Sequence, residues 1–161
     1  MKLKIPSTSA VRLLKSKGIA YSSHFYKYEE RGGTAVSARE LNVPEHSVIK
    51  TLVMEDDKRA PLIVLMHGDR QVSTKSLARQ IGARTISSCT PEVANKHSGY
   101  VVGGTSPFGT KKTMPVYLEG TILDLNEIYI NGGSRGFLVS IAPKVLLSLL
   151  DPVIVEVAIS D

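Results

Sequence analysis

Two apolar segments in the first half of the chain have the length and composition of neighbouring β-strands. Val48–Glu55 reads VIKTLVME, Pro61–Gly68 reads PLIVLMHG, and the charged sequence DDKRA lies between them. Short apolar runs rich in β-branched residues and bounded by a polar turn are typical of a hairpin. The pattern therefore predicts an antiparallel pair of strands at the centre of the fold.

Helix signals flank the predicted hairpin on both sides. They are clearest for the segment after it, where Ser73 provides an N-cap and Gly82 a left-handed stop. For the first helix, each hydroxyl residue of Ser7–Ser9 is a cap candidate. The expected helices cover Ser9–Lys17, Ala35–Leu41, Thr74–Ile81, Pro91–Lys96 and Pro143–Leu149.

Further strands are predicted along the rest of the chain. They cover Tyr21–Glu30, Pro115–Glu119, Glu127–Asn131, Gly136–Ile141 and Val153–Ile159. In the first of them a period of two places His24, Tyr26 and Tyr28 on one face, and a Gly132-Gly133 turn is expected before Gly136. Six or seven strands with short helices between them predict an α+β domain built on a mixed, mainly antiparallel sheet.

Composition agrees with a globular protein. The chain has 161 residues, 42% of them hydrophobic and 22% charged, so a single domain over residues 1–161 is expected. The longest apolar runs, Pro61–Met66 and Val145–Leu150, are too short to span a bilayer, and the N-terminal segment lacks the apolar core of a secretory signal. A cytoplasmic protein with no membrane contact is therefore expected.

The net charge and the cysteine and histidine content restrict which partners and which metal sites are expected. The formal net charge of +5 favours polyanionic partners without proving one. One cysteine, Cys89, excludes an intramolecular disulfide and a multi-cysteine zinc site. The four histidines do not have the spacing of a metal-binding motif, so no metal is expected; they are His24, His46, His67 and His97.

A glycine-rich loop is one candidate site. Gly104 and Gly109 have the glycine spacing of a P-loop, but Thr110 stands where the lysine should be, and a strand-like segment from Pro115 replaces the required helix. Two interpretations remain: a backbone N–H cradle for an anion or oxyanion, and a plain structural turn. Ser106 is not part of a G-x-S-x-G elbow, so its loop position alone supports a nucleophilic role.

Lys50 is the second candidate. On a strand it shares a face with Val48, Leu52 and Met54, so an ammonium group interrupts an apolar row. A lysine that faces a cavity is a common functional device, and a stem that snorkels at a sheet edge is the alternative. Cys89 precedes a helix but has no adjacent histidine, which favours a small buried side chain over a nucleophile.

A resemblance to a known family joins these elements. Lys50 in VIKTLV, the loop GYVVGGTSPFGTKK (Gly99–Lys112) and the segment INGGSRGFLVSIAP (Ile130–Pro143) resemble, in order and spacing, the YbaK/EbsC family. Its members are freestanding homologues of the editing insertion domain of bacterial prolyl-tRNA synthetase. The resemblance runs from the first helix to the last strand and implies a mixed, barrel-like sheet.

The resemblance also implies an activity, which is hydrolysis of the ester between a wrong amino acid and the 3′-terminal ribose of tRNA. The typical substrates are Cys- and Ala-tRNA(Pro), and no cofactor is expected. In cysteine-specific members the substrate thiol attacks its own carbonyl, so cyclisation is an alternative to attack by water. Lys50 is the implied essential lysine, and Gly103 and Gly104 are implied backbone contacts. The other expected substrate-binding residues are Tyr26, Thr51, Thr105, Ser106, Pro107, Asn131 and Leu138.

The implied partner is the acceptor end of tRNA, and docking on prolyl-tRNA synthetase is left open. Cysteine-specific members tend to carry a serine and a further polar residue where this chain has Asn131 and Leu138, so the amino acid removed is also open. Two other functions remain: a nucleotide- or tRNA-binding module without turnover, and a metal-dependent phosphohydrolase. The basic residues expected to contact the acceptor stem are Lys75, Arg79, Lys111, Lys112 and Arg135.

Overall fold

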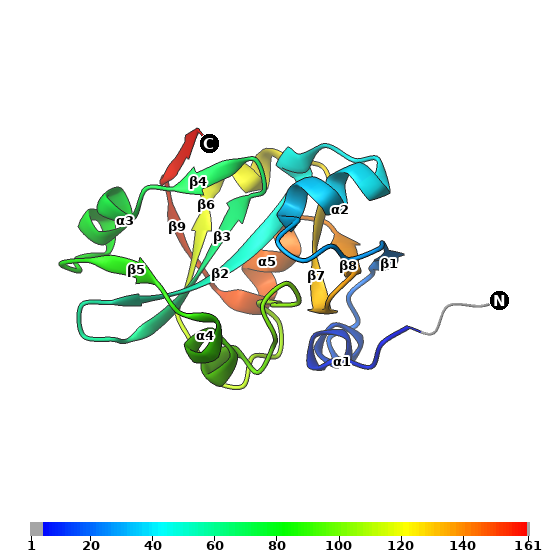
Figure 1. The fold of residues 1–161 in the computed structure, drawn as a ribbon, viewed down its shortest axis with the longest axis horizontal. Helices are drawn as coiled ribbons and strands as arrows, with labels where there is room; N and C mark the ends of the chain where they lie inside the picture. The colour runs from blue at the N-terminus through cyan, green and yellow to red at the C-terminus, as the bar shows by residue number, and fades with distance from the viewer. Residues whose placement is uncertain (1–4, 161) are drawn as a thin grey trace.

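A computed structural model describes residues 5–160 and shows a large mixed sheet with helices around it (Figure 1). The strands are β1 (Ser22–Phe25), β2 (Val48–Asp56), β3 (Pro61–His67), β4 (Arg70–Val72), β5 (Ile86–Ser88), β6 (Val116–Glu119), β7 (Ile128–Ser134), β8 (Phe137–Ile141), β9 (Val153–Val155) and β10 (Ala158–Ser160). The helices are α1 (Ser9–Ser16), α2 (Gly33–Leu41), α3 (Thr74–Ile81), α4 (Pro91–Ser98) and α5 (Lys144–Leu150), with the 3-10 turns η1 (Glu45–Ser47) and η2 (Gly120–Asp124).

The main sheet has the strand order β1-β8-β7-β2-β3-β6-β9, and β5 pairs with the far end of β2. A second, two-stranded sheet joins β4 and β10. Five of the eight strand pairs are antiparallel and three are parallel. The expected α+β class with a mixed, mainly antiparallel sheet is therefore confirmed. No helix among the described residues is long and apolar enough to cross a membrane.

The predicted helix boundaries depend on side-chain caps that the structure contains. Ser73 accepts a hydrogen bond from the amide of Ser76 at the start of α3, and Thr90 does the same at α4. Of the three candidates for α1, Thr8 is the cap. Local hydrogen bonds of this kind are encoded within a few residues, which explains why the sequence predicted them.

Two predicted elements are wrong. The segment Val153–Ile159 is not one strand: the buried carboxylate of Glu119 accepts hydrogen bonds from the amides of Val157 and Ala158, and the chain breaks there into β9 and β10. Gly132 and Gly133 do not form the turn after β7 but lie inside the strand at a bulge. The turn follows Ser134 instead.

The predicted strand Tyr21–Glu30 is also shorter than expected. Only β1 pairs with β8, and the amide of Tyr26 makes one last hydrogen bond to the carbonyl of Gly136. Beyond this point the chain leaves the sheet edge and crosses to α2, so Tyr28 and Glu30 are free to line a pocket.

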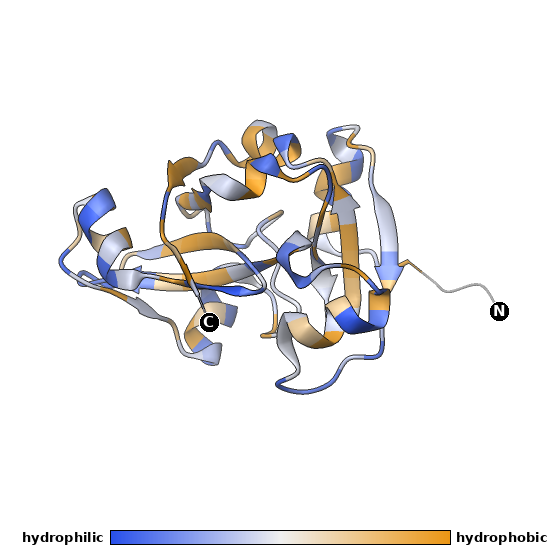
Figure 2. Ribbon diagram, turned by 90° about the horizontal axis from the view of Figure 1, so that it is seen from above, coloured by the Kyte–Doolittle hydropathy of each residue, from blue (hydrophilic) through white to orange (hydrophobic). Residues whose placement is uncertain are grey.

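The core lies on both faces of β3. Ile63 and Leu65 pack into a cluster with α1 and α5, whereas Leu62, Val64 and Met66 pack into a second cluster with α3. Figure 2 shows hydrophobic residues concentrated on the central strands. Because both faces of β3 are covered, the strand is almost continuously apolar, in contrast to its partner β2, where Lys50 and Thr51 interrupt the apolar residues.

Candidate functional site

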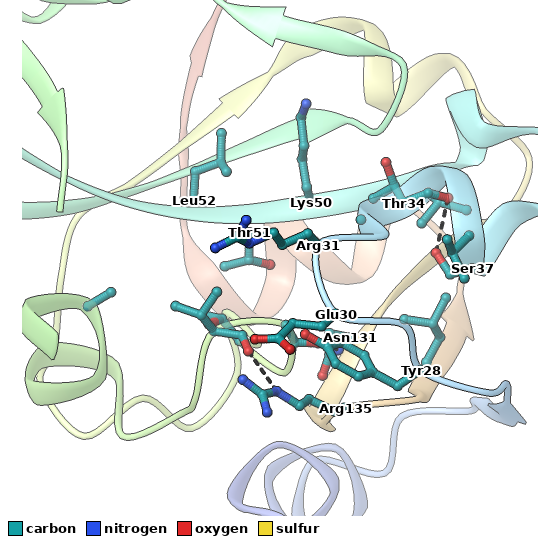
Figure 3. A pocket seen from close by; sticks show the side chains of 18 of the residues that line it. Tyr28, Glu30, Arg31, Thr34, Ser37, Lys50, Thr51, Leu52, Asn131 and Arg135 are labelled. Carbon is teal, nitrogen blue, oxygen red and sulfur yellow. Dashed lines mark hydrogen bonds between the residues drawn. The ribbon is translucent and has the colours of Figure 1, made fainter. Parts of the chain in front are cut away.

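A pocket of about 680 Å³ lies beside the middle of β2, between α2, the Val101–Thr105 loop and the end of β7 (Figure 3). Eight of the residues expected from the sequence line it: Tyr26, Lys50, Thr51, Gly103, Thr105, Asn131, Arg135 and Leu138. Residues from four separate parts of the chain thus meet around one cavity.

The pocket exists because β2 lacks a neighbour over part of one edge. This strand pairs with β7 only at Val48 and Ile49, and with β5 only from Met54 to Asp56. Between these partners, no strand among residues 5–160 pairs with Lys50–Val53 on the edge opposite β3. These four residues all line the pocket.

Lys50 leaves β2 on the same face as Leu52, as its sequence period predicted, and Figure 3 shows Thr51 on the opposite side of the strand. The pocket therefore extends around the open edge of β2 and reaches both faces. None of the ion pairs among the described residues involves Lys50. An ammonium group without a protein counter-ion beside a cavity is suited to bind an anionic or carbonyl oxygen.

Thr51 carries an unfilled hydrogen-bonding group. Its hydroxyl oxygen is buried and has no partner among the described residues. An unpaired buried hydroxyl costs about 1–3 kcal/mol, so its presence in the wall of a pocket is most simply explained by a ligand that supplies the missing partner.

The Val101–Gly104 loop is a tight turn in which the amide of Gly104 donates to the carbonyl of Val101 at 2.9 Å. Gly103 has a φ of 91°, which a residue with a side chain rarely adopts, and a Cβ there would lie 2.7 Å from the Tyr28 hydroxyl. Because the turn already uses the Gly104 N–H, Gly103 is the better candidate for a backbone donor. Gly104 itself is buried and does not line the pocket.

Two side chains from the β7 end hold this turn in place. Arg135 donates from Nε to the carbonyl of Val102 at 2.9 Å, and Asn131 donates from Nδ2 to the carbonyl of Gly103 at 3.0 Å. The Asn131 Oδ1 also accepts hydrogen bonds from two amides of the β7 bulge, at 2.6 and 3.1 Å. Arg135 further stacks on the ring of Tyr28, 5.0 Å from its centroid. The loop is thus fixed against the sheet.

Ser106 and Pro107 are buried and do not line the pocket. The Ser106 hydroxyl accepts a hydrogen bond from the amide of Phe108, so its observed contact supports the loop. Leu138 is buried against Ala38 and Val48 and forms part of the apolar wall.

Two titratable side chains of the pocket, Tyr26 and Cys89, are held in their neutral forms. Burial raises the pKa of the Tyr26 phenol. Burial, with a smaller contribution from Glu55, raises the pKa of the Cys89 thiol, which also lines the pocket. A thiol with a raised pKa carries little thiolate at neutral pH, so Cys89 is poorly suited to nucleophilic attack.

The sequence did not identify several other lining residues. Tyr28, Glu30 and Arg31 enter the pocket from the segment before α2, and Thr34 and Ser37 enter from α2 itself. The period of two that grouped Tyr26 with Tyr28 was a usable signal for one of them. The others depend on where α2 packs, which is a tertiary property.

Most of the basic residues expected to contact tRNA lie away from the pocket. Lys75 and Arg79 belong to α3 and, with Arg84, line a separate groove of about 420 Å³. Lys111 and Lys112 are exposed in the loop after Gly109. Only Arg135 of this group lines the pocket, where it also supports the glycine turn.

The structure also brings together His46, His67 and Asp69, which the sequence spacing did not suggest. The two imidazole rings stack at 3.7 Å, and His46 Nδ1 lies 2.8 Å from an Asp69 carboxylate oxygen. His67 is fully buried, with its ring nitrogens hydrogen-bonded to the His46 carbonyl at 2.7 Å and the Thr121 hydroxyl at 2.8 Å. A metal ion held by His67 would have to displace one of these hydrogen bonds.

Among solved structures, the chain resembles one described as a trans-editing enzyme for prolyl tRNA synthetase, with a TM-score of 0.81 and 22% identity. That match covers 97% of this chain and all of the other. The structure of hypothetical protein APE2540 matches with a TM-score of 0.85 and 21% identity over 94% of this chain and 99% of the other. At these identities the matches show a shared fold.

Sequence comparisons identify the family as well as the fold. The Enterococcus faecalis protein EbsC, named as a Cys-tRNA(Pro)/Cys-tRNA(Cys) deacylase, is 27% identical over 155 residues, which is 96% of this chain and 94% of that protein. A proline–tRNA ligase of Thermodesulfovibrio yellowstonii is 37% identical over 71 residues, 44% of this chain and 12% of the ligase. The family model of the aminoacyl-tRNA editing domain matches residues 29–149. The chain therefore belongs to the aminoacyl-tRNA editing domain family, as the resemblance implied.

Proposed function

We propose that the protein is a trans-acting deacylase that hydrolyses the ester bond of mischarged tRNA of the Cys- or Ala-tRNA(Pro) type. The observation that carries the proposal is the open edge of β2, where three groups line one cavity. They are Lys50, which has no ion-pair partner within residues 5–160, the Thr51 hydroxyl, which has no hydrogen-bond partner there, and the Gly103 turn. These groups suit a polar ester carbonyl next to an anionic phosphate.

The proposed reaction needs positioning and electrostatic stabilisation. A water oxygen adds to the ester carbonyl carbon, the bond from that carbon to the ribose oxygen breaks, and the ribose oxygen leaves as a hydroxyl after taking a proton. Lys50 binds the ester region or the terminal phosphate, and the Gly103 N–H is available to the developing oxyanion. Aminoacyl esters are reactive, so orientation can supply a large part of the rate enhancement.

The apolar wall around Leu138 restricts which aminoacyl side chain fits. Leu138 is 4% exposed and packs on Val48, so it presents no polar group to an incoming side chain. We expect alanine to be accepted at this wall, whereas a cysteinyl substrate has the second route in which its thiol attacks its own carbonyl. Tyr26 and Thr105 complete the proposed substrate contacts.

Binding of tRNA is proposed to use exposed basic residues outside the pocket. Lys111 and Lys112 lie in the same loop region as the Gly103 turn, and Arg135 lies at the pocket itself. Lys75 and Arg79 lie on α3 and would contact a more distant part of the acceptor stem.

The experiment that tests the proposal is a deacylation screen over several mischarged tRNAs, including Cys- and Ala-tRNA(Pro), with and without EDTA. We expect hydrolysis above the uncatalysed rate for at least one of the two proline tRNAs, and no loss of rate with EDTA. A Leu138→Ser variant serves as the specificity probe and is expected to shift the ratio of the two rates. Absence of hydrolysis for every substrate contradicts the proposal.

The second candidate is a nucleotide- or tRNA-binding module that does not turn over. It is favoured by one observation: the Lys50 side chain leaves β2 on the side opposite Thr51, so these two side chains do not converge on one point of the substrate. Tight binding of aminoacyl-tRNA without release of the amino acid would select this function.

A further inference from the structure

The main chain of β2 points in alternating directions, and the hydrogen bonds of its neighbours show which residues face the open edge. The carbonyl of Val48 accepts from the amide of Gly68, just after β3, whereas the carbonyl of Val53 accepts from the amide of Cys89, on the β5 side. Ile63 is the register partner of Val53, and its amide donates to the carbonyl of Pro115, on the side of β3 away from β2. Odd-numbered residues of β2 therefore direct their N–H and C=O groups away from β3.

Two residues of Lys50–Val53 are odd-numbered, and the carbonyl of one of them, Val53, already accepts from the amide of Cys89. The other is Thr51. By the same alternation its N–H and C=O both point into the gap between β7 and β5. Its hydroxyl oxygen, buried in the pocket wall, also lacks a partner among the described residues. One residue thus presents a main-chain donor, a main-chain acceptor and an unsatisfied hydroxyl to the same cavity.

We propose that the main chain of Thr51 binds the aminoacyl group by completing a two-hydrogen-bond antiparallel pair, so that the substrate occupies the missing position of the sheet. The inference rests on the proposed function. An aminoacyl ester carries an α-ammonium donor and a carbonyl acceptor on neighbouring atoms, the same pair that any residue presents along a strand edge. In such a pair the two residues exchange both hydrogen bonds at a Cα–Cα separation of about 5.5 Å.

The pairing fixes the orientation of the substrate along β2. The Thr51 N–H donates to the ester carbonyl oxygen and so stabilises negative charge there during attack by water. Because an antiparallel partner runs toward the start of β2, the ribose and its phosphate extend toward Lys50 and β7.

The test removes the Thr51 N–H while leaving the β2–β3 ladder intact. Thr51→Pro does this because the N–H of Thr51 faces away from β3, and a strand tolerates proline where the N–H is not used in the ladder. Thr51→Val is the matched variant, since it removes the hydroxyl and keeps the N–H. Both are assayed on the aminoacyl-tRNA that wild type hydrolyses fastest. We expect kcat to fall in the order wild type, Thr51→Val, Thr51→Pro, with about 100-fold between the last two.

Two outcomes separate this inference from the proposed function. If wild type hydrolyses no aminoacyl-tRNA, the proposed function fails. If wild type is active and a folded Thr51→Pro protein stays within about threefold of Thr51→Val, a main-chain hydrogen bond worth the expected factor is absent and the inference is overturned. Should Thr51→Pro not fold, replacement of the Thr51 amide by an ester removes the same N–H and is judged by the same ratio.

A ligand-side measurement tests the other hydrogen bond. The probe is an adenosine that carries alanine through a 3′-amide, which is not hydrolysed, and its match is the propionyl amide, which lacks the α-amino group. Titration calorimetry on wild type is expected to show at least about tenfold weaker binding for the propionyl compound, as for one lost charge-assisted hydrogen bond. Equal dissociation constants overturn the inference.

Discussion

The pocket beside β2 and the buried network around His67 are both polar, but they treat hydrogen-bonding groups in opposite ways. Glu119 lies at the end of the network: its carboxylate accepts hydrogen bonds from the amides of Val157, Ala158 and Thr121 and lies 2.8 Å from the Thr121 hydroxyl. His67 has a partner at each ring nitrogen. In the pocket, the Thr51 hydroxyl has none among the described residues.

This difference separates polar groups that stabilise the fold from polar groups that bind a ligand. A buried polar group that is fully hydrogen-bonded holds the fold together, and removing it is expensive. A buried polar group left without a partner reduces stability and is retained where a ligand can complete it. From this contrast we propose a folding role for Glu119 and His67, and a binding role for Thr51 and the open edge of β2.

The largest expected effect is on the network side. Glu119→Gln replaces an acceptor of three amide hydrogen bonds by a group that accepts fewer and introduces an unpaired donor. We expect the free energy of unfolding to fall by about 3 kcal/mol, measured by urea denaturation. At a temperature where the variant stays folded, its deacylation rate should match wild type; a large loss of rate with normal stability would contradict the assignment.

A smaller effect is expected at the support of the glycine turn. Asn131→Asp keeps an oxygen that accepts from the two bulge amides but removes the donor to the Gly103 carbonyl. We expect kcat to fall by about 10- to 100-fold, with KM within about threefold and the free energy of unfolding within about 1 kcal/mol. An unchanged kcat would show that the position of the turn does not matter for the reaction.

On the pocket side, stability and activity are expected to change in opposite directions. Thr51→Val replaces an unpaired buried hydroxyl by a methyl group of similar shape, so the variant should gain about 1 kcal/mol of stability while losing activity. Thermal unfolding of wild type and variant measures the first effect. A variant that is less stable than wild type would mean that the hydroxyl is satisfied in the folded protein.

The pH dependence of stability should come from the network. Burial is the main reason why the pKa of His67 lies below its ordinary value of 6.5. As pH falls through 6.5, His67 takes up a proton in the unfolded chain, whereas in the folded protein it stays neutral to a lower pH. The free energy of unfolding is therefore at its full value above pH 6.5 and declines below it. The decline should be smaller in His67→Gln. Stability that rises between pH 7 and pH 5.5 would contradict this.

Local patterns explain what the sequence predicted well. The β2–β3 hairpin, the caps of α3 and α4, and the shared face of Lys50 and Leu52 all depend on residues close together in the chain. The family resemblance supplied the activity class, which the sequence comparisons support.

Long-range contacts explain what the sequence missed. The three-residue strands β4 and β10 exist because they pair with each other across more than 80 residues, and β5 exists because it finds the far end of β2. The open edge at Lys50–Val53 could not be read from β2, because it is defined by where β7 and β5 stop. The turn that uses the Gly104 N–H is likewise visible only in the structure.

The central claim is that the pocket around Lys50 hydrolyses aminoacyl-tRNA, and single-turnover deacylation of Ala-tRNA(Pro) by wild type and Lys50→Ala tests it most directly. Lys50 forms no ion pair within residues 5–160, so its loss should leave the free energy of unfolding within about 0.5 kcal/mol. We expect wild type to release alanine and Lys50→Ala to be at least about 100-fold slower. Equal rates for the two proteins would contradict the account.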